Sequence, residues 1–354
     1  MLQLILGRAG SGKTTELYRR IGQVAEAGGQ AILLVPEQFS FENERELYLR
    51  LGPELSSRVE VLGFGRLCDN VFRYYGGLAG RALDDTARRI LMGVTLQEMG
   101  SGLEVYAAQA DKPGFIEDMI GEIGELKAAG VTPDRLFGLA LPGNPSLTEK
   151  IGDIASIYAA YQARLAAAGA MDFDDLIFLT VRLLRQEPEL REYYARRFAF
   201  VMVDEYQDTN HAQFVLTELL SSGGVLMVVG DDDQSIYKFR GATIENILSF
   251  ERRHRDAAVV RLEQNYRSTG TILDCANGTI ANNLGRKGKR LWTQNERGEP
   301  ARLYVAQDSY DEARFIAETV LDTCAREARD YGDFAVLYRS NAQSAAIEEA
   351  LLKS

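Results

Sequence analysis

Short apolar runs recur along this chain, and each ends in a polar or glycine-rich loop. The runs lie at residues 2–6, 31–35, 59–62, 200–203, 225–229, 259–262, 303–306 and 334–338 and are rich in Val, Ile and Leu on successive positions. Continuous runs of this length are typical of parallel strands that are buried on both faces. The pattern therefore predicts an α/β fold built on a parallel sheet.

Between Asp84 and Arg197 the hydrophobic period changes to a helical one. Apolar residues recur every three or four positions from Ile116 to Leu126 and again from Leu147 to Leu165, as on the buried stripe of a helix. Pro133, Pro142 and Pro145 fall in the break between these segments. We expect an inserted helical subdomain within the sheet domain. The predicted parts are 1–83 and 198–262 for the first lobe, 84–197 for the insertion and 263–354 for the start of a second, incomplete lobe.

The first apolar run leads directly into a phosphate-loop motif. The residues are Gly7, Arg8, Ala9, Gly10, Ser11, Gly12, Lys13, Thr14 and Thr15, which match GxxxxGK[ST], and a helical segment follows. Backbone N–H groups of such a loop wrap phosphates, while Lys13 reaches the β and γ phosphates and the Thr14 hydroxyl binds Mg²⁺. A glycine turn that binds nothing is disfavoured because both the strand and the helix are present. We therefore expect a site for ATP and Mg²⁺.

Acidic and amide side chains follow two later apolar runs. Asp204 and Glu205 end the run at 200–203, where one carboxylate can hold Mg²⁺ and the next can orient or deprotonate the attacking water. A pair of this kind also caps helices, so that alternative stays open. Gln234 follows the run at 225–229 and can hydrogen-bond a γ-phosphate.

The same loop continues with Tyr237, Phe239 and Arg240. Aromatic side chains can stack on nucleic-acid bases, with a gain of roughly 1–3 kcal/mol per base. The alternative is that these rings are ordinary core residues. A loop that holds both a phosphate sensor and a base platform would link hydrolysis to movement, which a phosphotransferase with no nucleic-acid role would not need.

A further candidate pair follows the run at 259–262. Tyr266 can stack on adenine, and Arg267 can neutralise charge on the transferring phosphoryl group, a role typically worth ~10³–10⁵ in kcat. A surface arginine in an ordinary ion pair is the alternative. We expect Lys13 and Arg267 to approach one triphosphate from facing walls of a single cleft.

The net charge of −11 and a pI near 5.0 disfavour a wholly basic nucleic-acid-binding surface. Local basic clusters remain available in ERRHR at 251–255 and GRKGKR at 285–290. These clusters can equally be solvated loop charges.

The three cysteines, Cys68, Cys275 and Cys324, form no CxxC pair. This spacing indicates neither a zinc site nor a disulfide framework and favours a reducing, cytoplasmic compartment. No apolar run approaches the ~18 residues of a membrane span, so we expect no membrane partner.

From Met171 onward the motifs together resemble those of superfamily 1A DNA helicases of the UvrD, Rep and PcrA group. In family order they are DFDDL at 172–176, DEYQDTN at 204–210, GDDDQSIYKFRGA at 230–242, LEQNYRST at 262–269 and YRSNAQS at 338–344. The resemblance implies two RecA-like lobes with ATP between them. It also implies 3′→5′ travel on single-stranded DNA in repair or recombination.

The resemblance also implies roles for individual residues. Asp204 and Glu205 become the Mg²⁺-binding and water-activating pair, Gln234 the γ-phosphate sensor, Tyr266 the adenine neighbour and Arg267 an arginine finger. Phe239 stands where many members have a base-stacking tryptophan. The expected DNA contacts are Tyr237, Phe239, Arg240, Arg339 and Asn341.

The front of the chain departs from that family. LVPEQFS at 34–40 and VLGFGRL at 61–67 replace the family's DNA motifs, and with GRAGSGKT they look like AddB, the partner subunit of bacterial helicase–nucleases. This favours a rival function, a nucleotide- and DNA-binding scaffold that works through a second helicase–nuclease subunit. The family's later motifs have no counterpart before Ser354. A further alternative is therefore an inactive helicase fragment that does not unwind DNA alone, and we expect an isolated chain to hydrolyse ATP slowly.

Overall fold

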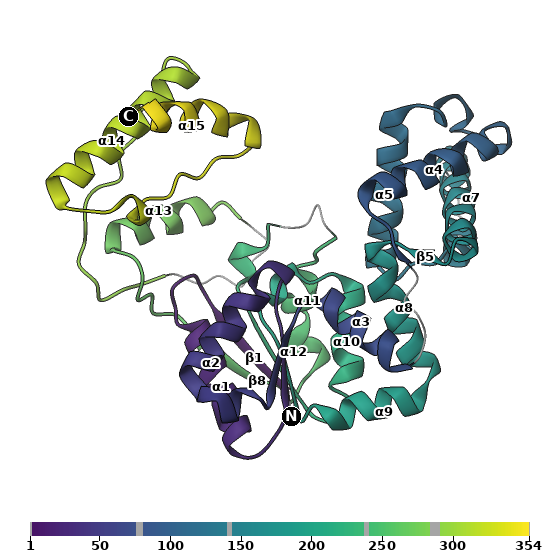
Figure 1. The fold of residues 1–354 in the computed structure, drawn as a ribbon, viewed down its shortest axis with the longest axis horizontal. Helices are drawn as coiled ribbons and strands as arrows, with labels where there is room; N and C mark the ends of the chain where they lie inside the picture. Colours follow the sequence, from purple (N-terminus) through teal and green to yellow (C-terminus); the bar gives the residue numbers. More distant parts are fainter. Residues whose placement is uncertain (1, 76–80, 140–143, 237–240, 284–290, 354) are drawn as a thin grey trace. The chain divides into compact units, whose positions relative to one another are not determined.

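A six-stranded parallel sheet organises the larger part of the chain (Figure 1). The computed structural model describes residues 2–75, 81–139, 144–236, 241–283 and 291–353. The strand order is β3-β2-β6-β7-β1-β8. The strands are β1 (Leu2–Gly7), β2 (Ala31–Leu34), β3 (Val59–Leu62), β6 (Phe200–Val203), β7 (Val225–Gly230) and β8 (Ala258–Leu262). The predicted α/β class is confirmed, and the first six predicted strands are present.

Alternate residues of the strands supply two separate cores. Leu4 and Leu6 pack on one face and Ile5 on the other, and all three are at most 1% exposed. Helices α1 (Lys13–Glu26) and α2 (Ser40–Ser56) cover the Ile5 face. The Leu4 face is covered by α3 (Phe64–Tyr75), α8 (Phe173–Gln186), α9 (Pro188–Arg197), α10 (His211–Leu220), α11 (Glu245–Leu248) and α12 (Phe250–Arg253). Burial on both faces explains why the strands have no polar alternation.

The helical insertion has a hydrophobic core of its own. Its helices are α4 (Asp85–Met99), α5 (Pro113–Ala128), α6 (Pro133–Phe137) and α7 (Pro145–Ala167). Where the chain enters and leaves it, β4 (Arg81–Ala82) pairs with β5 (Ala170–Met171). The proline-containing break holds the short helix α6, which begins at Pro133. Helices α8 and α9 fall inside the predicted range 84–197, but they bury their apolar side chains in the core beneath the sheet.

Residues Gly298–Ser354 form a compact unit of their own, whereas α13 (Gly270–Ile280) belongs to the unit Met1–Arg297. The smaller unit contains α14 (Ser309–Glu327) and α15 (Ser344–Lys353). The prediction of strands at 303–306 and 334–338 is wrong. Leu303, Val305 and Leu337 are 91%, 81% and 94% exposed, and both segments lie outside any ladder among the described residues. An apolar run becomes a strand only where a neighbouring strand accepts its backbone hydrogen bonds.

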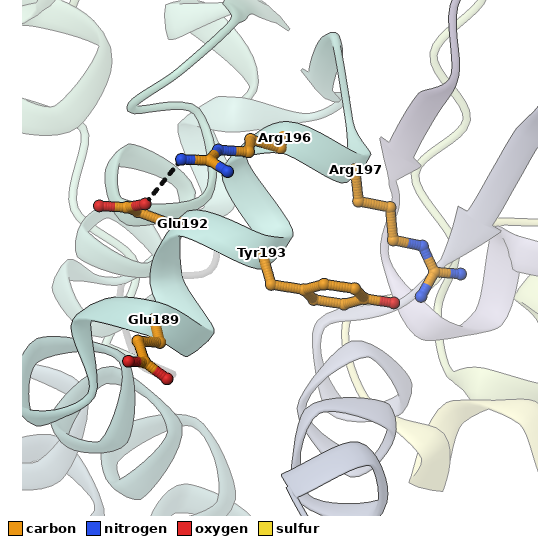
Figure 2. A pocket seen from close by; sticks show the side chains of 5 residues that line it. All are labelled: Glu189, Glu192, Tyr193, Arg196 and Arg197. Atoms are coloured by element: carbon orange, nitrogen blue, oxygen red, sulfur yellow. Dashed lines mark hydrogen bonds and ion pairs between the residues drawn. The ribbon is translucent and has the colours of Figure 1, made fainter.

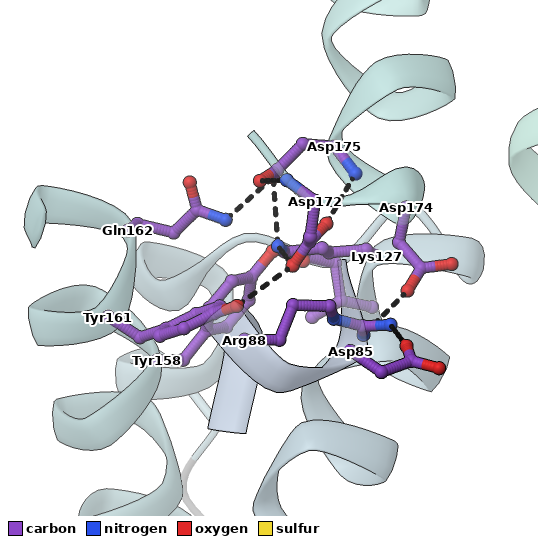
Figure 3. Close-up of polar contacts among 10 residues, drawn as sticks. Asp85, Arg88, Lys127, Tyr158, Tyr161, Gln162, Asp172, Asp174 and Asp175 are labelled. Carbon is purple, nitrogen blue, oxygen red and sulfur yellow. Dashed lines mark hydrogen bonds and ion pairs between the residues drawn. The ribbon is translucent and has the colours of Figure 1, made fainter. Parts of the chain in front are cut away.

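A fully buried lysine joins the helical insertion to the sheet domain (Figure 3). Lys127 Nζ on α5 lies 2.6 Å from Asp172 Oδ2 and 2.9 Å from Asp175 Oδ1. The rings of Tyr158 and Tyr161 on α7 lie 6.0 and 5.3 Å from the same ammonium group. Asp172 and Asp175 also cap the start of α8 reciprocally. One cation therefore fixes α5 and α7 to the first turn of α8.

Lys127→Met should destabilise the fold strongly, because it leaves the Asp172 and Asp175 carboxylates buried without their cation. Removal of one partner from a buried ion pair costs about 3–5 kcal/mol. Urea unfolding followed by circular dichroism measures the change. Lys150→Met, at an exposed position of α7, is the matched control and should stay within about 0.5 kcal/mol of wild type. Equal stability of the two variants would contradict this account.

Candidate nucleotide site

The carboxyl ends of the strands meet at one edge of the sheet, where the predicted nucleotide-site residues gather. In the β1–β7 pair Leu6 lies opposite Gly230, and in the β1–β8 pair Gly7 lies opposite Leu262. The loops that follow β1, β7 and β8 therefore begin at nearly the same level. In open α/β sheets this edge is where ligands bind.

The phosphate loop forms a tight turn between β1 and α1. Gly10 and Gly12 have φ angles of 71° and 84°, a region that glycine enters without a steric penalty. A methyl group added to Gly7 would lie 2.8 Å from Lys13 Cγ, so the loop curls closely over the strand end. Lys13 is buried, whereas Thr14 and Thr15 are exposed. The buried Ser11 hydroxyl has no hydrogen-bond partner among the described residues and can donate to a phosphate oxygen.

Asp204 and Glu205 follow β6 at the same edge. The Asp204 backbone N–H donates to the Leu34 carbonyl at 2.9 Å, and its carboxylate accepts from the Glu205 N–H at 2.9 Å. Glu205 adopts a left-handed conformation with φ 49°. Burial, followed by the Glu205 charge, raises the pKa of Asp204 to about 6, and the nearby Lys13 acts in the opposite direction. Burial thus favours the neutral Asp204 carboxyl, and a cation bound beside it would favour the charged form.

Gln207 connects the acidic pair to the next strand, a role that the sequence reasoning missed. Its Nε2 donates to Glu205 Oε2 at 2.7 Å, and its Oε1 accepts from the Asp231 N–H at 2.9 Å. A methyl group on Gly230 would lie 2.6 Å from Gln207 Oε1. The sequence did contain a signal for this contact, a glutamine after β6 and a glycine at the end of β7. Adjacent parallel strands end side by side, so the glutamine can reach the backbone beside that glycine.

Gln234 lies in a 3-10 turn over Asp232–Gln234 that follows β7. Its Nε2 donates to Asp231 Oδ2 at 2.5 Å. The Gln234 side chain is therefore held by Asp231, the first residue after β7. Three predicted DNA-binding residues, Tyr237, Phe239 and Arg240, lie outside the described residues.

The segment after β8 is attached directly to the phosphate loop. The Tyr266 N–H donates to the Gly10 carbonyl at 2.9 Å, and Asn265 Nδ2 donates to the Ala9 carbonyl at 2.6 Å. Asn265 Oδ1 accepts from the Arg267 and Ser268 N–H groups at 2.9 and 2.7 Å. A methyl group on Gly10 would lie 2.6 Å from Arg267 Cβ. Arg267 and the phosphate loop are thus neighbours, and Asn265, which the sequence reasoning passed over, aligns them.

Tyr266 and Arg267 both present exposed side chains beside this loop, and the Tyr266 ring is 64% exposed. Arg339 and Asn341 lie in the separate unit Gly298–Ser354 and are also exposed. There the Arg339 N–H donates to Gln343 Oε1 at 2.9 Å.

A cavity of about 650 Å³ adjoins the acidic pair and is bounded by α5, α8 and the loop after β2. Its lining includes the carboxyl groups of Glu37, Glu125, Asp174, Asp204, Glu205 and Asp208. Burial and the Glu205 charge raise the pKa of Asp208 to about 6, and burial with the Asp172 charge does the same for Asp174. Glu37, from the segment 34–40 that stands in place of a family DNA motif, therefore contributes to an acidic wall, which repels a phosphate backbone.

A different hollow of about 560 Å³ lies along α9 (Figure 2). Its arginines are already paired. Arg196 contacts Glu192 at 2.9 Å, and Arg197 is bonded to Glu60 at the start of β3. This hollow lies toward the amino ends of the strands and contains none of the predicted site residues.

The basic clusters are only partly described. Arg252 pairs with Glu245 at 3.5 Å, and the Arg253 guanidinium lies 4.5 Å from the centre of the Phe214 ring. Arg252 and Arg253 therefore both make contacts within the chain. This is compatible with the alternative that the cluster consists of ordinary solvated charges. The whole GRKGKR cluster at 285–290 falls outside the described residues.

Within the described residues, no group of three or more His, Cys, Asp or Glu side chains is placed to hold a metal ion unaided. None of the described helices is both long and apolar enough to cross a membrane.

The parallel sheet, the glycine-rich loop at its edge and the carboxylates beside it define a RecA-like P-loop protein. Residues 4–239 match the family described as ADDB, N-terminal, and this chain belongs to that family. Residues 260–354 match the UvrD-like helicase C-terminal domain. The resemblances expected for the two halves of the sequence are confirmed.

Curated relatives are similar along the whole chain. The chain is 40% identical to "ATP-dependent DNA helicase UvrD1" of Mycobacterium tuberculosis and to the protein of that name in Mycobacterium leprae. It is 38% identical to "ATP-dependent DNA helicase PcrA" of Staphylococcus aureus. Each comparison covers 99% of this chain but only 46%, 46% and 47% of the respective relative. The chain spans about half the length of the curated relatives that it matches.

Asp204→Asn should stabilise the protein at neutral and alkaline pH. The folded-state pKa of Asp204 is raised from 3.8 to about 6, so its contribution is fully present below pH 3.8 and is lost as pH rises through 6. Such a shift corresponds to about 2–3 kcal/mol. Urea unfolding should show the variant more stable than wild type at pH 8 and nearly equal at pH 4. Asp256→Asn, at an exposed position, should change little at either pH. A gain independent of pH would be inconsistent with burial of the charge.

Proposed function

We propose that this chain forms the ATP-hydrolysing part of a UvrD-type DNA helicase or translocase. It would act in the cytoplasm and move 3′→5′ on single-stranded DNA during repair or recombination. The proposal is carried by the attachment of Asn265 and Tyr266 to the phosphate loop, because it brings Arg267 to the loop that receives phosphate. We also propose the division into 1–83, 84–197, 198–262 and 263–354 as its domains, except that α8 and α9 are counted with the sheet domain, because their apolar side chains pack in its core, and α13 with the unit Met1–Arg297.

The phosphate loop would hold the triphosphate. Backbone N–H groups from Gly7 to Thr15 surround the phosphates, and Lys13 supplies the cation for the β and γ groups. The unpaired Ser11 hydroxyl fits an additional phosphate oxygen. Thr14 and Asp204 would hold Mg²⁺, and the ion would supply positive charge to neutralise the charge on the phosphate groups.

The remaining edge residues would act on the γ-phosphate and the attacking water. Glu205 orients or deprotonates the water for in-line attack, and Gln207 holds that carboxylate at 2.7 Å. Gln234 hydrogen-bonds the γ-phosphate, while Arg267 neutralises the transferring group. Tyr266 packs against adenine through its exposed ring.

Single-stranded DNA would be the partner along which ATP hydrolysis drives the chain. The proposed contacts are Tyr237, Phe239, Arg240, Arg339 and Asn341. Bases stack on the aromatic rings, and the arginines neutralise phosphates. The carboxyl groups around the cavity beside Asp204 would repel a DNA phosphate backbone that brings no Mg²⁺, so the DNA would follow another surface.

A second candidate is a nucleotide- and DNA-binding scaffold that acts through a second helicase–nuclease subunit. Two observations favour it. Residues 4–239 match the family described as ADDB, N-terminal, and six carboxyl groups line the cavity beside Asp204 and Glu205. The candidates differ in one measurable property. A motor hydrolyses ATP faster when single-stranded DNA is added, whereas a scaffold does so only when its partner subunit is present.

Lys13→Ala should weaken ATP binding at least about tenfold, because a charge-assisted contact contributes roughly 1.5–3 kcal/mol. Isothermal titration with MgATP measures the affinity. Lys150→Ala, which removes an exposed lysine from α7, should bind ATP as wild type does. An unchanged affinity in Lys13→Ala would refute the nucleotide site.

Phe239→Ala should weaken binding of a single-stranded oligonucleotide roughly 5- to 150-fold, the loss expected for one stacked base. ATP affinity should remain at the wild-type value. Fluorescence anisotropy with a labelled oligothymidylate measures the first, and isothermal titration measures the second. Phe137→Ala removes an exposed ring from α6 and should leave DNA affinity intact. Wild-type DNA affinity in Phe239→Ala would remove the ring from the DNA track.

A further inference from the structure

The second residue of the phosphate loop carries a buried charge that phosphate binding itself does not require. Loops of this type use backbone N–H groups and the later lysine for the phosphates. Arg8 is nevertheless only 3% exposed. Its Nη2 lies 2.7 Å from Asp233 Oδ2, and its Nη1 donates to Asn277 Oδ1 at 3.1 Å. One side chain thus links the loop after β1 to the loop after β7 and to α13.

The contact with Asp233 leads in two steps to the predicted γ-phosphate sensor. The Asp233 N–H donates to Asp231 Oδ1 at 3.1 Å. The other carboxylate oxygen of Asp231 accepts from Gln234 Nε2 at 2.5 Å. Asp231 is 1% exposed, so its orientation is set by these bonds and by its neighbours. A series of bonds therefore runs from Arg8 through Asp233 and Asp231 to Gln234.

Stability alone does not account for the Arg8–Asp233 pair. Burial of two opposite charges costs desolvation energy that their attraction often only balances, and apolar replacements are frequently as stable. What such a pair does provide is a fixed geometry, because the planar guanidinium accepts few arrangements. Here the fixed geometry joins the loop that holds phosphates to the loop that carries Gln234.

We propose that Arg8 is a positioning residue that holds Gln234 in place to contact the γ-phosphate, and so makes the site distinguish a nucleoside triphosphate from a diphosphate. This inference rests on the proposed nucleotide-binding function. Arg8 acts through Asp233 and Asp231. Its loss should therefore affect triphosphate binding and leave diphosphate binding largely intact, because the diphosphate is held by the backbone of the loop and by Lys13.

The experiment measures the affinities of ADP and of the non-hydrolysable analogue AMP-PNP, both with Mg²⁺, by isothermal titration. Their ratio is the triphosphate preference. In Arg8→Ala this preference should fall about fivefold or more, within the usual range of coupling between sites. ADP affinity should stay within about twofold of wild type, the tolerance expected for a site that is not coupled. Arg19→Ala, at an exposed position of α1, should change neither affinity.

Three further variants test the path from Arg8 to Gln234. Gln234→Ala should lose the same preference, and Arg8→Ala with Gln234→Ala should lose no more than Gln234→Ala alone, because the two residues act in series. Asp233→Asn keeps the side-chain volume and removes the charge, so it should also lower the preference. It provides the same test if Arg8→Ala proves unfolded by circular dichroism.

Several results would overturn the proposal. A parallel fall in ADP and AMP-PNP affinity in Arg8→Ala would make Arg8 a general support of the phosphate loop. Action through Gln234 would be excluded if the losses of triphosphate preference in the two single variants multiplied in the double variant. It would also be excluded by an unchanged preference in Asp233→Asn, or by a wild type that binds both nucleotides equally. A wild-type chain that binds neither nucleotide would instead refute the proposed function itself.

Discussion

The pairing of β1 between β7 and β8 is the constraint on which the site depends. Parallel register places Gly7 opposite Leu262 and Leu6 opposite Gly230, so three loops leave the sheet at a common level. Close approach of those loops then requires glycine at Gly7 and Gly230, where an added methyl group would meet Lys13 or Gln207. The geometry of the site is therefore fixed by backbone hydrogen bonds before any functional side chain is placed.

Side-chain amides make the connections between these loops. Gln207 joins the loops after β6 and β7, and Asn265 joins the segment after β8 to the phosphate loop. An amide both donates and accepts without burial of a net charge. Asn265 thus satisfies backbone groups on two sides, and Gln207 satisfies the Glu205 carboxylate and the Asp231 N–H. The raised pKa of Asp204 follows from burial of its carboxylate and from the neighbouring Glu205 charge, at the position proposed for Mg²⁺.

The helical insertion shapes the approach to this edge. Lys127 fixes α5 and α7 to the start of α8, and α5 and α8 then form walls of the acidic cavity beside Asp204 and Glu205. The cavity and the phosphate loop differ in the charge of the ligands that they favour. The phosphate loop with Arg267 favours anions, whereas the cavity favours cations or neutral groups. This contrast bears on the choice between a motor and a scaffold, because a nucleic-acid backbone would avoid the acidic side.

The sequence by itself determined the first six strands, the phosphate loop and the acidic pair, because each depends on residues adjacent in the chain. Local pattern also misled at 303–306 and 334–338, where apolar runs lie outside any ladder. Only the tertiary structure decided that Asn265 donates a hydrogen bond to the Ala9 carbonyl and that Arg8 forms an ion pair with Asp233. These contacts join residues more than two hundred positions apart, and their partners are chosen by strand order and register, which no local pattern encodes.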